Sequence, residues 1–305
     1  MSGSVLSIGE CMVELAQTGP DTYRRGFAGD TFNTAWYARR LLPPEWNVSY
    51  GTCVGHDAVS DEMLAFMRDA GIDIRAIRRV EGRSVGLYMI SVDNGERSFS
   101  YWRDQSAARR MTEDMGWIET LLSGRDWIHL SGITLAILPP TGRTALCQAL
   151  DRARETGAQV SFDTNLRPRL WEGEDAMRAG LTRGAAAADL VLPSFDEETS
   201  LFGDATPSDT IARYRDGGSA MVVVKDGEGP VTLWSEATGE RTLTPQPVTP
   251  VDTTAAGDSF AAGLLAGLAT GADLETAAAS AMGLAGGVIQ HTGALVPQIF
   301  EGGDT

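Results

Sequence analysis

The chain has 305 residues, enough for one large α/β domain or two small ones with a sizeable core, which excludes fibrous, disordered and mini-protein classes. With 41 acidic and 25 basic side chains its net charge is −16, and Lys225 is the only lysine. This acidity argues against a nucleic-acid-binding surface and favours a soluble protein that acts on small molecules.

Cysteine usage and hydropathy indicate the compartment. Cys11, Cys53 and Cys147 are odd in number and widely spaced, so we expect reduced thiols in the core. No basic segment precedes the first apolar stretch, and no apolar run approaches the roughly 20 residues of a membrane span. We therefore expect a cytoplasmic protein without a membrane or nucleic-acid partner.

Short apolar strands alternate with amphipathic helical stretches along the chain. The first predicted strands are residues 5–8 and 48–54, and Asp30 and Thr31 are predicted to cap a helix between them that ends before Pro43. The later predicted elements are strands 127–130, 159–162, 190–192 and 220–224 and helices 140–155 and 175–187. This alternation predicts a mainly parallel sheet with helical crossovers in a single domain spanning residues 1–305.

One segment departs from this pattern. Residues 85–92 and 97–103 are two strands joined by the turn signal Asp-Asn-Gly-Glu, so they cannot be parallel neighbours. We expect them to pair with residues 11–15 and 23–27 in a small projecting sheet, which makes 11–27 and 85–103 the segments of a lid or an oligomer interface. Tyr101 and Arg103 are predicted to face one side of this sheet, and Trp102 to pack against a neighbouring element on the other.

A polar loop opens directly onto a helix in the string Val-Asp-Thr-Thr-Ala-Ala-Gly-Asp-Ser-Phe, residues 251–260. Free N–H groups at 255–258 and the positive end of the helix dipole would bind a phosphate group. Asp258, in the first helical turn, could take a proton from an attacking hydroxyl group. An ordinary acidic helix start is the alternative.

This string resembles the C-terminal signature of the ribokinase-like, or PfkB, carbohydrate kinases, Asp-Thr-x-Gly-Ala-Gly-Asp-x-Phe, with Ala255 in place of the usual glycine. Residues 8–15, 25–35, 131–138 and 162–171 are similar to the 2-keto-3-deoxygluconate kinase branch, with Ala28 where a second glycine is common. The resemblance covers almost the whole chain. It implies a three-layer α/β/α core with a β-sheet lid, and ATP-dependent phosphorylation of 2-keto-3-deoxy-D-gluconate to 2-keto-3-deoxy-6-phosphogluconate in the Entner–Doudoroff pathway.

The resemblance also implies the site residues. Asp258 would be the general base, and Ala255, Ala256 and Gly257 would stabilise the transferring phosphoryl group. The residues implied in sugar binding are Gly29, Asp30, Asn33, Tyr88, Tyr101, Arg103, Arg167 and Asp258. Arg103 suits the acid group of the substrate because guanidinium pairs well with carboxylate, and a side chain at position 29 is expected to occupy sugar space.

Nucleotide binding is implied for a second set of residues, which includes the alternating polar side chains after the strand 159–162, at the expected ligand edge of the sheet. The set is Asn165, Arg167, Ser194, Lys225, Gly227, Gly229, Thr254, Ala255, Gly257, Gly287 and Gln290. Mg²⁺ would bridge the phosphates of ATP, with Glu197 acting on it through water. The resemblance leaves a monovalent cation open.

Several alternatives stay open. A kinase of the same fold could act on fructose, 2-keto-3-deoxygalactonate or a nucleoside, and a non-catalytic sugar-acid sensor could share the fold. A Rossmann dehydrogenase is disfavoured because the turn after the first strand, Gly-Glu-Cys-Met, contains no GxGxxG. The expected partners are a sugar acid and ATP, and a homo-oligomer through the lid sheet is a further alternative.

Overall fold

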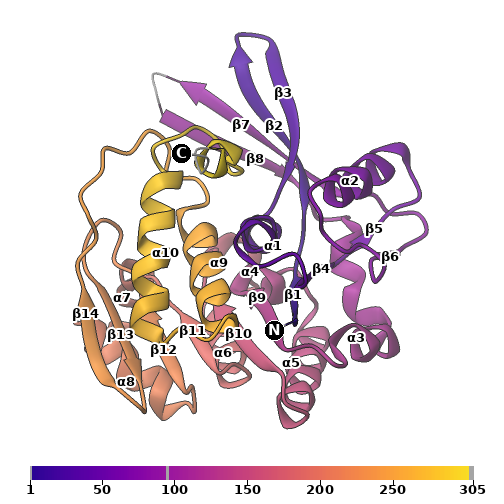
Figure 1. Ribbon diagram of the computed structural model, residues 1–305. Coiled ribbons are helices and arrows are strands. Elements are labelled where there is room, and N and C mark those ends of the chain that lie inside the picture. The colour runs from indigo at the N-terminus through magenta and orange to yellow at the C-terminus, as the bar shows by residue number, and fades with distance from the viewer. Residues whose placement is uncertain (1, 94–95, 302–305) are drawn as a thin grey trace.

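The main sheet has eight strands in the order β14-β13-β12-β11-β10-β9-β1-β4 in the computed structural model, which describes residues 2–93 and 96–301 (Figure 1). Its strands are β1 (Ser4–Ile8), β4 (Asn47–Gly51), β9 (Trp127–Ser131), β10 (Gln159–Asp163), β11 (Leu190–Leu192), β12 (Met221–Val224), β13 (Val231–Ser235) and β14 (Gly239–Leu243). The strands β12, β11, β10, β9, β1 and β4 pair in parallel, and β13 and β14 add an antiparallel edge. The predicted mainly parallel sheet is confirmed.

The predicted strand 48–54 is wrong in its length. It divides at Thr52 into β4 and β5 (Cys53–Val54), and β5 leaves the main sheet to pair with β6 (Arg78–Arg79). The carbonyl oxygen of Thr52 accepts the N–H of Arg78 at 3.2 Å, so the backbone at the division is hydrogen-bonded to the partner strand.

Helices cover both faces of the main sheet (Figure 1). One face carries α1 (Asp30–Leu41), α2 (Ala58–Asp69), α9 (Ala256–Ala269) and α10 (Leu274–Val288). The opposite face carries α3 (Met115–Leu122), α5 (Pro140–Glu155), α6 (Glu174–Ala186), α7 (Phe195–Phe202) and α8 (Pro207–Asp216), with the short α4 (Gly132–Ala136) after β9. Short 3₁₀ helices span Ala107–Glu113, Pro168–Leu170 and Pro297–Phe300. The three-layer α/β/α core is therefore confirmed.

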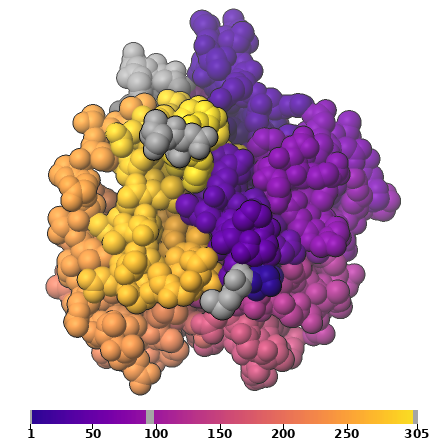
Figure 2. Space-filling model, in the orientation of Figure 1, coloured from indigo at the N-terminus to yellow at the C-terminus, as the bar shows by residue number. Residues whose placement is uncertain are grey.

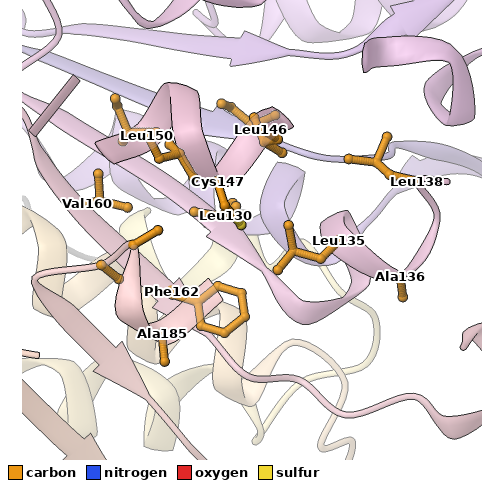
Figure 3. Close-up of a cluster of buried hydrophobic side chains, with 14 of the residues drawn as sticks. Leu130, Leu135, Ala136, Leu138, Leu146, Cys147, Leu150, Val160, Phe162 and Ala185 are labelled. Carbon is orange, nitrogen blue, oxygen red and sulfur yellow. The ribbon is translucent and has the colours of Figure 1, made fainter. Parts of the chain in front are cut away.

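Alternating strand residues form the two cores. Leu6 and Ile8 of β1 belong to the core under α5 and α6, whereas Val5 belongs to the core under α1 and α9, as the period of two in a strand requires. Figure 3 shows part of the first core, where Phe162 of β10 lies near Leu135 of α4, both of them against Gly184 of α6. All three cysteines are buried free thiols, as predicted.

The lid is a separate four-stranded sheet in the order β3-β2-β7-β8, which projects from the body (Figures 1 and 2). Its strands are β2 (Met12–Gly19), β3 (Thr22–Ala28), β7 (Gly86–Asp93) and β8 (Glu96–Trp102). The predicted pairing of the two lid segments is confirmed, and the centre of the predicted turn, at 94 and 95, lies outside the described residues. The prediction for Trp102 is wrong, since it is 58% exposed. None of the helices in the described part of the chain combines the length and apolarity of a membrane span.

Candidate active site

Polar side chains gather at the edge of the main sheet where the parallel strands end. Ser131 ends β9, Asp163 ends β10 and Lys225 directly follows β12. The N-terminal ends of α1 and α9 meet at this edge, because Asn33 of α1 donates a hydrogen bond to Asp258 of α9 at 2.8 Å. Open α/β sheets bind their ligands at this edge, and the lid rises from the same end of the body (Figure 1).

Residues 252–257, which comprise the loop before α9 and the first two residues of that helix, are called the anion loop below. Ala255 has a left-handed backbone, with φ 61° and ψ 17°, which costs a residue with a Cβ about 1 kcal/mol more than it costs glycine. The N–H of Ala256 donates to the carbonyl oxygen of Thr253 at 3.2 Å, so the prediction of free amides throughout 255–258 is wrong at Ala256. Within the described chain the N–H groups of Ala255, Gly257 and Asp258 donate no hydrogen bond, and they can bind an anion.

Asp258 lies in the first turn of α9, as predicted. Its pKa is raised to about 8, chiefly by desolvation and then by the negative charges of Asp30 and Asp163, while the Asn33 hydrogen bond and the charge of Lys225 lower it. A carboxyl group with a pKa near neutrality can both accept and release a proton, which general acid–base catalysis requires.

The N-terminus of α1 differs from the sequence prediction. Gly29 is the N-cap residue and Asp30 makes no capping hydrogen bond. Instead the Asp30 carboxylate accepts the Ser131 hydroxyl at 2.5 Å and the Asn165 amide at 3.0 Å. The prediction that Asp30 caps the helix is therefore wrong, and its side chain joins α1 to the ends of β9 and β10.

Gly29 is required by a backbone contact. A Cβ at position 29 would lie 2.2 Å from the carbonyl oxygen of Glu10, far inside van der Waals contact. The structure thus gives a different reason for glycine here than the expected occupation of sugar space.

Asp163 and Lys225 form an ion pair beside the anion loop. The Lys225 ammonium donates to both Asp163 carboxylate oxygens, each at 3.0 Å. Asn165, two residues further on, has a left-handed backbone with φ 31°, a sparsely populated conformation that clusters at functional sites.

Arg167 and Glu197 lie close to this ion pair, at the same edge of the main sheet. Nη1 of Arg167 donates to Glu197 at 3.1 Å, and the other Glu197 oxygen accepts the N–H of Leu166 at 3.0 Å. Burial raises the pKa of Glu197, and the charge of Arg167 opposes this shift.

The residues at this edge of the sheet fit Mg²⁺ only through water-mediated contacts. Within the described chain, no three His, Cys, Asp or Glu side chains form a metal-binding group. Both oxygens of Glu197 already accept hydrogen bonds, which agrees with contact through water. Mg²⁺ commonly keeps several waters and is held mainly by substrate phosphates with one or two carboxylates.

The predicted lid residues are brought to the base of the lid, where acidic partners hold two of them. The hydroxyl of Tyr88 donates to Glu14, and Arg103 donates through Nε (2.8 Å) and Nη2 to one oxygen of Glu10. The ring of Tyr101 lies beside that of Tyr88, with centroids 5.9 Å apart and the planes tilted by 30°, and Tyr101 remains 52% exposed. Arg103 is therefore charge-paired, although its Nη1 makes no hydrogen bond to the described residues.

The predicted nucleotide residues lie in two groups. Ser194 forms a backbone bridge with Lys225, and the chain then turns at Gly227, whose φ of +54° favours glycine, and reaches Gly229. Gly287 and Gln290 lie at the end of α10, where the carbonyl oxygen of Ile289 accepts the N–H groups of residues 251 and 252. The Gln290 side chain donates to the carbonyl oxygen of Gly286 at 2.9 Å. Thr254, in the anion loop, donates to Asp252 through its N–H and its hydroxyl.

Sequence reasoning missed the partners of the site residues. Glu10, Glu14 and Ser131 all lie in strings that resemble the kinase family, yet none was assigned a role. Glu10 comes two residues after the end of β1, so the signal that could have identified it is a polar residue beyond a parallel strand, as used for the polar residues after the strand 159–162.

A first-turn carboxylate beside unbonded amides, at the ligand edge of an α/β sheet with a projecting β-sheet at the same end, is an arrangement suited to phosphoryl transfer to a small molecule. The chain belongs to the pfkB family carbohydrate kinases, whose family model matches residues 2–299.

Three known proteins show the extent of the likeness. A 2-dehydro-3-deoxygluconokinase of Escherichia coli K12 is 40% identical over 305 residues, 98% of both chains. The crystal structure of a PfkB protein from Polaromonas has a TM-score of 0.87 and 28% identity over 99% of this chain and 100% of that one. A fructokinase from Xylella fastidiosa, solved with bound ATP, shares the fold with a TM-score of 0.82 and 23% identity over 95% of this chain and 93% of its own.

Proposed function

We propose that this protein transfers the γ-phosphoryl group of ATP to the terminal hydroxyl of 2-keto-3-deoxy-D-gluconate, also called 2-dehydro-3-deoxy-D-gluconate. The observation that carries the proposal is the Asp258 carboxylate at the N-terminus of α9, beside the unbonded amides of Ala255, Gly257 and Asp258. The name of the E. coli relative supports the choice of sugar.

In the proposed reaction Asp258 accepts the proton of the substrate hydroxyl. The hydroxyl oxygen then bonds to the γ-phosphorus, the bond from that phosphorus to the bridging oxygen of ADP breaks, and ADP leaves. The three amides and Arg167 stabilise the charge on the transferring group. Glu197 would contact Mg²⁺ through water, and the ion would supply neutralising charge to the phosphoryl oxygens.

Binding of the sugar falls to the two helix-end residues Asp30 and Asn33 and to the lid. Asn33 already donates to the base, so a sugar hydroxyl beside it would lie within reach of Asp258. Tyr88, Tyr101 and the open Nη1 of Arg103 are proposed to bind the acid end of the substrate, and closure of the lid excludes the water that would otherwise hydrolyse ATP.

For the nucleotide we propose contacts along the exit of β12 and the end of α10. The residues are Asn165, Arg167, Ser194, Lys225, Gly227, Gly229, Thr254, Gly287 and Gln290.

An uncharged ketose is the second candidate substrate, and one observation favours it. Arg103 is already paired with Glu10, so the base of the lid has less net positive charge to attract a carboxylate. Fructose is the simplest such sugar.

A substrate panel tests these alternatives. ADP release is coupled to NADH oxidation with 2-keto-3-deoxygluconate, 2-keto-3-deoxygalactonate, fructose or no sugar, in potassium and in sodium buffers, and the phosphorylated carbon is located by ³¹P–¹³C coupling. We expect the highest kcat/KM with 2-keto-3-deoxygluconate and phosphate on C6. A higher kcat/KM with fructose would establish the second candidate, and no turnover with any sugar would support a sensor.

The lid is also proposed to join two copies of the chain. β8 is an outer strand of the lid sheet, and it carries the exposed aromatic residues Phe99 (42%) and Trp102 (58%). Unpaired strand edges and exposed apolar side chains favour association. Light scattering should give a dimer or larger species for the wild type and a monomer for Trp102→Lys, whereas equal masses would contradict the proposal.

A further inference from the structure

Lys225 is proposed above to contact the nucleotide, but its ion pair with Asp163 has no role in the reaction as described so far. The side chains of Asp163 and Lys225 are 7% and 13% exposed, and the ammonium donates to both carboxylate oxygens at 3.0 Å. Such a buried pair adds little net stability compared with apolar side chains of the same volume. Stability alone therefore does not account for the only lysine of the chain.

The backbone around the lysine is firmly held. The N–H of Lys225 donates to Pro193 and its carbonyl oxygen accepts the N–H of Phe195, both at 2.8 Å. β11 lies between β10 and β12 in the sheet, so the Lys225 side chain reaches over the end of β11 to meet Asp163. This reach brings the ammonium toward α9.

The ammonium lies against the anion loop. A Cβ built at Gly257 would be 3.6 Å from Lys225 Nζ and 3.9 Å from an Asp163 oxygen. The N–H of Gly257 makes no hydrogen bond within the described residues, so an amide donor and a cation lie side by side. A phosphoryl group bound by the amides would meet the ammonium as well.

We propose that Asp163 is a positioning residue that holds the Lys225 ammonium against the anion loop, where it binds the transferring phosphoryl group. This inference rests on the proposed function. The two carboxylate oxygens fix the direction of the flexible lysine side chain before ATP arrives, which reduces the reorganisation needed during phosphoryl transfer.

The pair also acts on the base through its charges. Asp258 is faced by Asp30, Asn33 and Tyr37 of α1, by Asp163 and by Lys225. Lys225 lowers the pKa of Asp258 and Asp163 raises it. Removing one charge at a time should therefore move the acid limb of the pH–rate profile in opposite directions.

The experiment measures kcat, KM for ATP and the pH dependence of kcat/KM for the sugar in Lys225→Met, Asp163→Asn and the double variant. For Lys225→Met we expect kcat to fall about 10²-fold, as for the loss of one transition-state donor, and the acid limb to move to higher pH. For Asp163→Asn we expect a smaller fall in kcat and a limb at lower pH. The limb of the double variant should lie between those of the two single variants.

Two further variants serve as controls. One tests whether the position of the cation matters as well as its charge, and the other tests whether the loss of any partly buried ion pair has the same effect. Lys225→Arg keeps the charge but not the geometry, so the limb should stay at the wild-type pH while kcat falls. Arg154→Met removes a partly buried ion pair with Asp189, outside the site, and should change neither quantity. Melting temperatures of all variants check that they fold.

The inference is overturned if both single variants move the limb in the same direction or not at all. It is also overturned if Lys225→Met raises only the KM for ATP, because the lysine would then contact the nucleoside and not the transferring group. A wild type without sugar-dependent turnover or without an acid limb would instead contradict the proposed function.

Discussion

The two ends of the proposed sugar site balance their charges differently. At the lid end Arg103 and Glu10 form a buried one-to-one pair. At the catalytic end three carboxylates, of Asp30, Asp163 and Asp258, act on one another with Lys225 as their cation. With Glu14, which accepts the Tyr88 hydroxyl, the lid end has two carboxylates and one guanidinium, whereas the catalytic end has three carboxylates and one ammonium and so holds the larger excess of negative charge.

This difference separates binding from proton transfer. Burial, and after it the neighbouring negative charge, raises the pKa of Asp258 to about 8. The raised pKa suits a base, but the negative charge repels an incoming phosphoryl group. The anion loop offsets that repulsion with backbone amides, which carry no titratable group. At the lid end the charge of Arg103 is neutralised by Glu10. Its guanidinium therefore orients a substrate through directed hydrogen bonds more than it attracts one by charge.

The largest expected effect tests the catalytic end. Asp258→Asn removes the base while keeping the shape of the side chain, so kcat should fall by about 10²- to 10⁴-fold, the usual contribution of general base catalysis. Steady-state assays with saturating ATP and sugar measure it. Turnover within threefold of wild type would exclude Asp258 as the base.

The same variant has a stability signature that serves as its folding control. The folded-state pKa of Asp258 is about 8 and the ordinary value is 3.8. Between these values the unfolded chain releases this proton while the folded protein keeps it, so the fold loses stability as pH rises from 3.8 to about 8. Asp258→Asn should melt above the wild type at pH 8, and the gap should close as pH falls toward 4. A variant that melts lower at pH 8 would contradict the raised pKa.

Local signals in the sequence were enough to predict the frame of the site. Apolar strands alternating with helices gave the parallel sheet, and the 93–96 turn signal separated the lid strands from it. The anion loop string, directly before a run of small and apolar residues, gave the helix start that presents Asp258.

Polar partners distant in sequence could not be predicted. Asp30 looks like a helix cap because its local context fits one, but Ser131 and Asn165 compete for its carboxylate. The pairing of Lys225 with Asp163 depends on which strand lies between them, and the sequence pattern does not contain that order. For Arg103 the resemblance implied a contact with the acid group of the substrate, but it did not indicate that the fold pairs Arg103 with Glu10.

A double variant tests the lid end. Glu10→Gln with Arg103→Met removes both charges, which avoids leaving one buried charge unpaired. If Nη1 of Arg103 binds the substrate acid group, KM for 2-keto-3-deoxygluconate should rise about 10- to 100-fold, the value of a charged hydrogen bond, while KM for fructose changes less than threefold. Steady-state kinetics with both sugars measure this, and equal changes for the two would contradict carboxylate binding.

A smaller effect is expected from the hydrogen bond that opposes the raised pKa. Asn33→Leu removes the donor to Asp258, so the acid limb of kcat/KM should move up by about one pH unit, as the loss of a hydrogen bond to a charged group implies. The variant also raises KM for the sugar, because Asn33 is proposed to bind it. The measured quantity is therefore the pH at which the acid limb falls, and not the size of kcat/KM. The control, Asn47→Leu, removes a similar bond to Asp73 (3.2 Å) at the other end of the sheet and should leave the acid limb in place. If the acid limb does not move in Asn33→Leu, the bond from Asn33 does not tune the pKa of Asp258.

The smallest effect concerns the backbone of the anion loop. Ala255→Gly removes the cost of a Cβ at φ 61°, and part of that gain is offset because glycine is more flexible in the unfolded chain. The net stabilisation should be about 0.5 kcal/mol, raising the melting temperature by about 1–2 °C. Ala279→Gly in the exposed part of α10 is the matched control and should lose about 1 kcal/mol, since its backbone is helical. Scanning calorimetry measures both, and a lower melting temperature for Ala255→Gly would mean that the left-handed residue before α9 is not strained.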